Sequence, residues 1–157
     1  MDYISRSEDD TVALARRLAA GLKPGDVLCL HGDLGMGKSV FARGLIRAFS
    51  NKPDLEVPSP TFTLVQTYDT DAGDVWHFDL YRLKSPDEVY ELGWEEGRAN
   101  AIVIVEWPER LGYLMPPGRI DINLSQAADG ARLLQITGET ARVSDLLSDI
   151  QQADGQP

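Results

Sequence analysis

A glycine-rich segment early in the chain restricts the fold more than any other feature of this sequence. Residues 32–39 read Gly-Asp-Leu-Gly-Met-Gly-Lys-Ser and match the pattern G-x-x-x-x-G-K-[ST]. A short apolar run at residues 26–30 precedes the segment, and apolar residues at helical spacing follow it up to Phe49. Strand, glycine loop and helix in this order form the setting that a phosphate-binding P-loop requires. A glycine-rich turn that binds nothing is the alternative.

Each residue type in this loop has a role at a polyphosphate. Glycines let the backbone bend so that several N–H groups point at one anion, and the start of the following helix adds its positive end. Lys38 would supply a mobile cation for the terminal phosphates, and the Ser39 hydroxyl a hard oxygen ligand for Mg²⁺. The nucleotide-binding residues predicted in the loop are Gly32, Asp33, Leu34, Gly35, Met36, Gly37, Lys38, Ser39 and Val40.

Length and charge limit what else the chain can be. Its 157 residues suffice for one domain, expected over residues 1–151, with a frayed tail at 152–157. The formal net charge of −10 argues against independent nucleic-acid binding, which needs a basic surface. No apolar stretch approaches the roughly 20 residues of a membrane helix. The acidic N-terminus predicts no signal peptide, and the single cysteine, Cys29, favours a reducing, cytoplasmic setting.

Hydrophobic periodicity and turn signals predict the order of the elements. Helices are expected at residues 8–21, 38–49, 86–93 and 140–151, and strands at 26–30, 61–68, 75–80, 101–105, 120–125 and 132–137. Two pairs of these strands are joined by short polar turns and predict antiparallel hairpins. The continuous apolar run at 101–105 is typical of a central strand that is buried on both faces. This order predicts a three-layer α/β fold with a mixed parallel and antiparallel sheet.

Two acidic residues near strand ends are candidate partners of the P-loop. Asp79 lies near the end of the strand at 75–80, and Glu106 directly follows the apolar run. A carboxylate that closes a buried strand is costly unless it is paired or metal-bound, so either residue could serve Mg²⁺ or an attacking water. The alternatives are a salt bridge from Asp79 to Arg82 and an ordinary strand-end position for Glu106.

The segment Pro-Ser-Pro-Thr-Phe-Thr at residues 58–63 has two interpretations. Prolines pre-set the backbone, so Thr61 could be held where it reaches the γ-phosphate or Mg²⁺, as in a switch loop. The segment could equally be a rigid connection to an edge strand. His77 and Trp107 are expected to be packing residues.

Several segments taken together resemble one protein family. They are His-Gly-Asp-Leu-Gly-Met-Gly-Lys-Ser at 31–39, Pro-Ser-Pro-Thr-Phe-Thr-Leu-Val at 58–65, His-Phe-Asp-Leu-Tyr-Arg-Leu at 77–83, Glu-Leu-Gly at 91–93 and Val-Glu-Trp-Pro at 105–108. In order and spacing they are similar to the motifs of the TsaE (YjeE) family, the small P-loop ATPase of bacterial tRNA threonylcarbamoyladenosine (t6A) biosynthesis. The resemblance extends from the first predicted helix to about Pro108.

This resemblance implies a function and a set of site residues. The cofactors would be ATP and Mg²⁺, and the ATPase would be slow alone and would work with the TsaD–TsaB pair that modifies adenosine 37 of tRNA. Metal binding is implied for Ser39 and Glu106, and further nucleotide contacts for Glu8 and Arg132. The catalytic residues would be Asp79, Glu106, Thr61 and Lys38.

Three other nucleotide-dependent functions stay open at this point. A small-molecule kinase shares the P-loop, but it needs an acceptor pocket and usually an arginine-bearing lid. A GTPase switch is the second alternative, and an assembly factor that binds nucleotide without hydrolysing it is the third. The motifs fix no arginine finger, although Arg43, Arg82 and Arg132 are candidates.

Overall fold

The computed structural model describes residues 1–154. Within them, the strands are β1 (Asp2–Ser5), β2 (Val27–His31), β3 (Val65–Thr70), β4 (Gly73–Asp79), β5 (Ile102–Glu106), β6 (Ile120–Gln126) and β7 (Arg132–Gly138). The α-helices are α1 (Glu8–Ala19), α2 (Lys38–Ser50), α3 (Trp94–Asn100) and α4 (Ala141–Asp154). Short 3₁₀ segments are η1 (Pro86–Leu92), η2 (Pro108–Leu114) and η3 (Ala128–Gly130).

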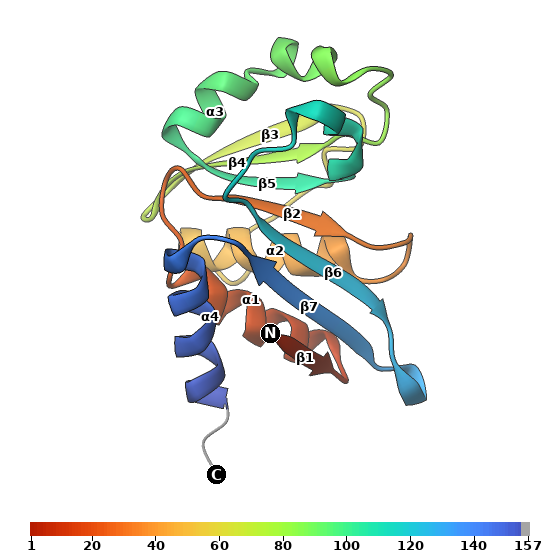
Figure 1. The fold of residues 1–157 in the computed structure, drawn as a ribbon, viewed down its shortest axis with the longest axis vertical. Helices are drawn as coiled ribbons and strands as arrows, with labels where there is room; N and C mark the ends of the chain where they lie inside the picture. The colour runs from red at the N-terminus through yellow and green to blue at the C-terminus, as the bar shows by residue number, and fades with distance from the viewer. Residues whose placement is uncertain (155–157) are drawn as a thin grey trace.

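The strands form one mixed sheet, as predicted. Its order is β1-β7-β6-β2-β5-β4-β3, and Figure 1 shows the strands following this order from the lower to the upper part of the view. Strand β2 pairs in parallel with β5 and β6, and β5 pairs in parallel with β4. The pairs β3–β4, β6–β7 and β1–β7 are antiparallel. The carboxyl ends of β2, β4, β5 and β6 therefore meet at one edge.

Helices cover both faces of the sheet and give the three predicted layers. Alternate residues of β2 point to opposite faces, so Leu28 and Leu30 pack with α1, α2 and α4, whereas Val27 and Cys29 pack with η1, α3 and η2. Central strands buried in this way need apolar side chains at every position, which explains the continuous apolar runs in the sequence. No helix within residues 1–154 is long and apolar enough to cross a bilayer.

Several elements differ from the sequence expectations. Strand β1 was not expected, and it pairs at the edge of the sheet with β7. Strand β3 begins at Val65 rather than at residue 61, because Leu64 has a φ of 68° and its N–H donates to the Pro60 carbonyl in a turn. Residues 86–92 form a 3₁₀ helix rather than an α-helix, and α3 follows as a separate element.

The C-terminal helix extends beyond its predicted end. Helix α4 continues to Asp154, so residues 152–154 are helical rather than frayed. The remainder of the predicted tail, residues 155–157, lies outside the described residues.

Candidate functional site

The glycine-rich loop connects the carboxyl end of β2 to the start of α2 and needs its glycines for two different reasons. At Gly32 the φ is 144°, and a Cβ would lie 2.6 Å from the carbonyl oxygen of Leu124 on β6. At Gly35 and Gly37 the φ values are 83° and 102°, in the left-handed region that side chains disfavour. Gly37 is the N-cap of α2, so the loop delivers the helix N-terminus directly to the sheet edge.

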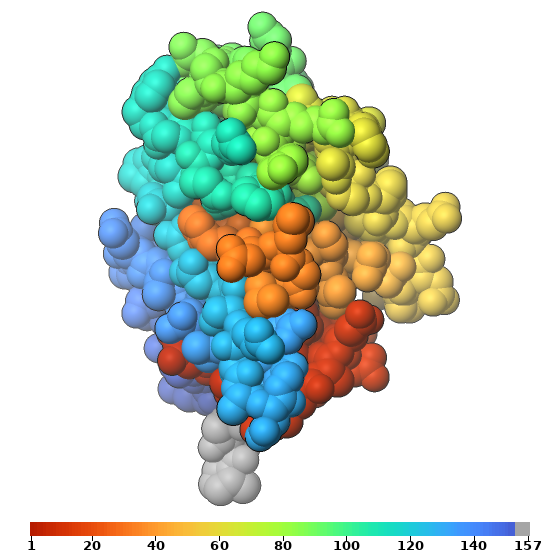
Figure 2. Space-filling model, turned by 90° about the vertical axis from the view of Figure 1, so that its right-hand side faces the viewer, coloured from red at the N-terminus to blue at the C-terminus, as the bar shows by residue number. Residues whose placement is uncertain are grey.

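A cavity of about 450 Å³ opens beside this loop and gathers most of the candidate residues. Its lining comes from the P-loop and α2, from the segment before β3, and from the ends of β4 and β5. The predicted residues among its lining are Leu34, Gly35, Gly37, Lys38, Ser39, Val40, Thr61, Asp79 and Glu106, and they are joined by Ser59, Tyr81 and Trp107. Figure 2 faces this edge and shows the orange P-loop segment at the middle of the surface.

The two candidate acids are neighbours on adjacent parallel strands. Asp79 of β4 lies opposite Glu106 of β5 in the sheet register, and the two residues are only 5% and 4% exposed. Asp79 accepts hydrogen bonds from the Thr61 hydroxyl at 3.3 Å and from the Tyr81 N–H at 3.1 Å. The alternative salt bridge to Arg82 is not formed, because the Arg82 guanidinium stacks on the Phe62 ring instead.

Glu106 has a buried partner that sequence reasoning missed. The Nε2 atom of His77 lies 2.7 Å from Oε2 of Glu106, and His77 is 2% exposed. The other ring nitrogen, Nδ1, is buried and has no hydrogen-bond partner within the described residues. A signal was present, since residues two apart on a strand share a face and His77 precedes Asp79 by two. The contact nevertheless required knowledge that β4 lies beside β5.

The ammonium group of Lys38 packs against an aromatic ring rather than pairing with a carboxylate. It is 6% exposed, and its Nζ atom lies 4.0 Å from the centroid of the Trp107 ring. Trp107 follows Glu106 with a left-handed φ of 57°, which turns the chain at the end of β5. Within residues 1–154 Lys38 makes no ion pair, so its charge can be given to a bound phosphate without breaking one.

The outlying candidates Glu8 and Arg132 lie on the other side of the P-loop. Both line a second hollow, of about 250 Å³, together with Gly35, Met36, Gly37 and Val40. A guanidinium N–H of Arg132 donates a hydrogen bond of 3.4 Å to the carbonyl oxygen of Gly35. Gly32 and Asp33 line neither hollow. The loop therefore separates two open spaces, one acidic and one beside the start of α1.

The donor set of the main cavity suits a hard divalent cation. The Ser39 hydroxyl and the carboxylates of Asp79 and Glu106 are oxygen ligands of the kind that Mg²⁺ prefers, and Mg²⁺ keeps several waters while binding few protein groups. Because His77 occupies one oxygen of Glu106, the other oxygen is the one available to a metal or its water.

Residues 51–54, Asn-Lys-Pro-Asp, match the [NT]-K-x-D pattern that reads guanine in GTPases. Their position excludes that role at this P-loop. Asn51 is the C-cap of α2, and a helix of 13 residues places it about 20 Å from the loop that starts the helix.

Comparison with known proteins agrees with this geometry. The sequence model of the family described as threonylcarbamoyl adenosine biosynthesis protein TsaE matches residues 5–134. The tRNA threonylcarbamoyladenosine biosynthesis protein TsaE of Rickettsia bellii is 44% identical over 136 residues, which are 87% of this chain and 94% of that protein. The protein of the same name from Bacillus subtilis is 33% identical over 147 residues, 93% of this chain and 90% of its own.

A solved structure shares the fold. The crystal structure of Bacillus subtilis YdiB superposes with a TM-score of 0.76 at 28% identity, covering 98% of this chain and 95% of that one. The family model, the sequence alignments with the relatives and the structural superposition each cover most of the chain. Each of them includes the P-loop and both acidic strand ends. The chain therefore belongs to the TsaE family of threonylcarbamoyl adenosine biosynthesis proteins.

Proposed function

We propose that this protein binds ATP with Mg²⁺, hydrolyses it slowly, and supports threonylcarbamoylation of tRNA adenosine 37 together with the TsaD–TsaB complex. The observation that carries the proposal is one cavity in which Lys38, Ser39 and two buried carboxylates meet at the start of α2. Family membership supplies the pathway, t6A biosynthesis in tRNA. The same role implies a cytoplasmic location.

The residues divide the work by chemistry. Backbone N–H groups of the loop and the N-terminus of α2 hold the phosphates, and Lys38 moves from the Trp107 ring to the terminal phosphates. Ser39 and Glu106 hold Mg²⁺, directly or through water, and the metal neutralises negative charge on the phosphates when it is bound. Asp79 orients the attacking water, and Thr61 reports the γ-phosphate through its hydrogen bond to Asp79.

The slow rate follows from what the cavity lacks. No arginine among residues 1–154 lines this cavity, and Arg132 contacts the loop from its other side, so the cavity itself offers no arginine finger for the transferred phosphoryl group. A protein partner could supply that charge or order the segment before β3. This absence also disfavours the kinase alternative, which needs an arginine-bearing lid.

Steady-state ATP turnover, measured with and without the purified TsaD–TsaB pair of the same organism, tests the proposal. We expect slow release of inorganic phosphate from the isolated protein, faster release with the pair, and loss of both in the Lys38→Ala variant. Lys84→Ala, which changes an exposed lysine outside the cavity, is the matched control. Phosphate transferred to an acceptor other than water would favour a kinase, and ATP binding without turnover would favour a nucleotide-dependent assembly factor.

A further inference from the structure

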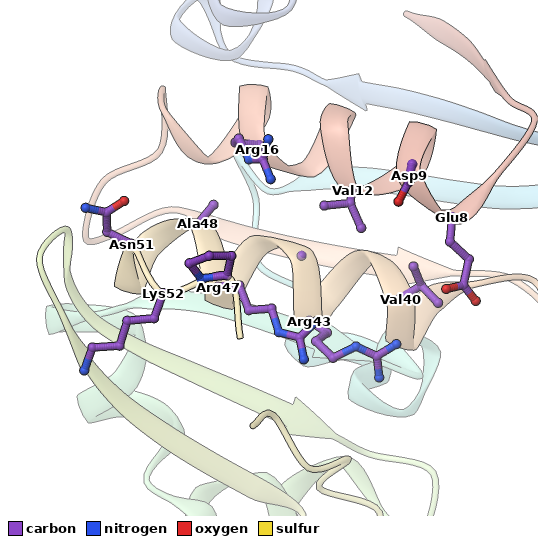
Figure 3. Close-up of a pocket in the computed structure, with 12 residues that line it drawn as sticks. Glu8, Asp9, Val12, Arg16, Val40, Arg43, Arg47, Ala48, Asn51 and Lys52 are labelled. Atoms are coloured by element: carbon purple, nitrogen blue, oxygen red, sulfur yellow. The ribbon is translucent and has the colours of Figure 1, made fainter. Parts of the chain in front are cut away.

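A third hollow, of about 470 Å³, lies between α1 and α2 and takes no part in the proposed chemistry (Figure 3). We call it the α1–α2 groove. Its apolar lining consists of Val12 from α1, of Val40, Gly44 and Ala48 from α2, and of Pro53 beyond α2. The two helices approach closely here: a Cβ added at Gly44 of α2 would lie only 3.1 Å from the Cβ of Ala15 on α1. The groove thus offers a narrow apolar strip on the surface.

Cationic side chains flank this strip. They are Arg16 on α1, Arg43 and Arg47 on α2, and Lys52 just beyond the end of α2, as Figure 3 shows. Within residues 1–154, the side chains of Arg16, Arg43 and Lys52 make no hydrogen bond or ion pair, and Arg47 donates only to the Leu55 carbonyl at 2.9 Å. This concentration of unneutralised positive charge contrasts with the formal net charge of −10 for the whole chain.

We propose that the α1–α2 groove docks an amphipathic helix of a protein partner whose polar flanks are acidic. An apolar strip between two helices fits the apolar stripe of a third helix, which is the helix-in-groove mode of recognition. Glutamate or aspartate beside that stripe would reach the cations on the rim, and such charge complementarity speeds and orients association.

Nucleic acid fits the same groove less well. A phosphodiester backbone gains nothing from contact with Val12, Val40 and Ala48. A protein helix gains from both the apolar strip and the cations, so a helix is the occupant that the chemistry favours.

The docking site adjoins the nucleotide site and shares two of its predicted residues. Glu8 and Val40 line both the α1–α2 groove and the hollow beside the P-loop, so one end of a docked helix would lie near bound nucleotide. The proposal needs no particular partner and does not depend on ATP hydrolysis.

Fluorescence anisotropy with a labelled synthetic helix tests the groove. The probe carries leucines at helical spacing along one stripe and glutamates on both flanks, and a matched peptide carries lysine in place of every glutamate. A tRNA transcript is the third probe. We expect saturable binding of the acidic peptide alone, weakened at least tenfold in Arg16→Glu/Arg43→Glu.

The control variant is Lys23→Glu/Lys84→Glu, which makes the same change in net charge at two exposed lysines outside the groove. It should bind the acidic peptide like the unmodified protein. Neither substituted arginine has a side-chain hydrogen bond or ion pair within the described residues, so both variants should fold, and thermal melting checks this. The proposal is overturned if the acidic peptide does not bind saturably, if the two variants bind it equally, or if the lysine peptide or the tRNA binds as tightly.

Discussion

At the scale of single residues, the contact between His77 and Glu106 determines how the acidic half of the site is presented. Both side chains are buried, and a hydrogen bond between them fixes one carboxylate oxygen of Glu106. Groups that orient metal-binding carboxylates contribute strongly to metal affinity and activity without touching the substrate. His77 is therefore a positioning residue in the proposed mechanism.

We expect His77→Leu to lower Mg²⁺-dependent ATP turnover by about 10- to 100-fold, the range found when groups that support a metal site are removed. His77→Gln keeps an N–H donor and should retain more activity than His77→Leu. The Mg²⁺ concentration needed for half-maximal turnover should rise in both variants, and more in His77→Leu than in His77→Gln. Tyr68→Phe is the control and should behave like the parent, because it removes a buried hydroxyl of β3 that has no hydrogen-bond partner within residues 1–154. Equal turnover in His77→Leu and the parent would refute the positioning role.

Cys29 on β2 gives a second residue-scale prediction. Burial, followed by the nearby Asp121, raises the pKa of its thiol from 9.0 to about 12. The folded chain therefore keeps this proton at pH values where the unfolded chain loses it, and stability falls as pH rises above 9 until about 12. By about pH 10 this loss amounts to about 1.4 kcal/mol.

Urea unfolding between about pH 8 and pH 10 measures the effect. The Cys29→Ala variant is less stable at neutral pH because of its cavity, but its stability should decline less over this interval than that of the parent. Parallel curves for the two proteins would show that the thiol does not contribute.

At the scale of elements, the P-loop conformation depends on Gly32 more than on Gly35. A Cβ at Gly32 would press against backbone, whereas a Cβ at Gly35 has open space and meets only the cost of its left-handed φ. We expect Gly35→Ala to lower the free energy of unfolding by about 1–2 kcal/mol and Gly32→Ala by about 3 kcal/mol or more. Chemical denaturation of both variants decides the matter, and a Gly32→Ala variant no less stable than Gly35→Ala would contradict the structure.

Elements with strong apolar patterns could be predicted from the sequence. Residues 26–30 and 101–105 are buried on both faces and read as strands without help from the fold, and the β6–β7 hairpin shows the alternation of a half-exposed sheet. Strand β1 could not be predicted, because four residues, two of them polar, are too short a pattern and become a strand only by pairing with β7.

The break between η1 and α3 falls at Gly93, where the sequence predicted the helix to end. Gly93 has a φ of 82°, and the Trp76 ring lies so close that a Cβ there would be 2.8 Å from it. The P-loop residues of the candidate site could be identified because their spacing is local. The contact of His77 with Glu106 could not, since it joins two strands that are separated by 22 residues of other structure.

At the scale of the whole molecule, charge is distributed unevenly. The chain carries a formal net charge of −10, yet four cations flank the α1–α2 groove and a fifth, Lys38, lies in the P-loop. Binding to nucleic acid by counterion release needs a continuous basic surface, which an acidic chain of this kind opposes. Contact with tRNA during t6A synthesis would then depend on partner proteins.

We therefore expect no saturable binding of a tRNA transcript by the isolated protein at about 0.15 M ionic strength, where the screening length is about 8 Å. Filter binding with and without the TsaD–TsaB pair is the measurement, and retention of tRNA should require the pair. Retention by the isolated protein at micromolar concentration would contradict the charge argument.

The central claim is that the P-loop cavity takes up ATP together with Mg²⁺, and equilibrium titration with labelled ATP tests it most directly. Uptake by the parent protein should saturate at one nucleotide per chain and should depend on Mg²⁺. Lys38→Ala should weaken it at least tenfold, or about 1.4 kcal/mol, while Lys84→Ala leaves it unchanged. Failure of the folded parent to saturate, or equal affinity in Lys38→Ala, would show that this cavity is not a nucleotide site.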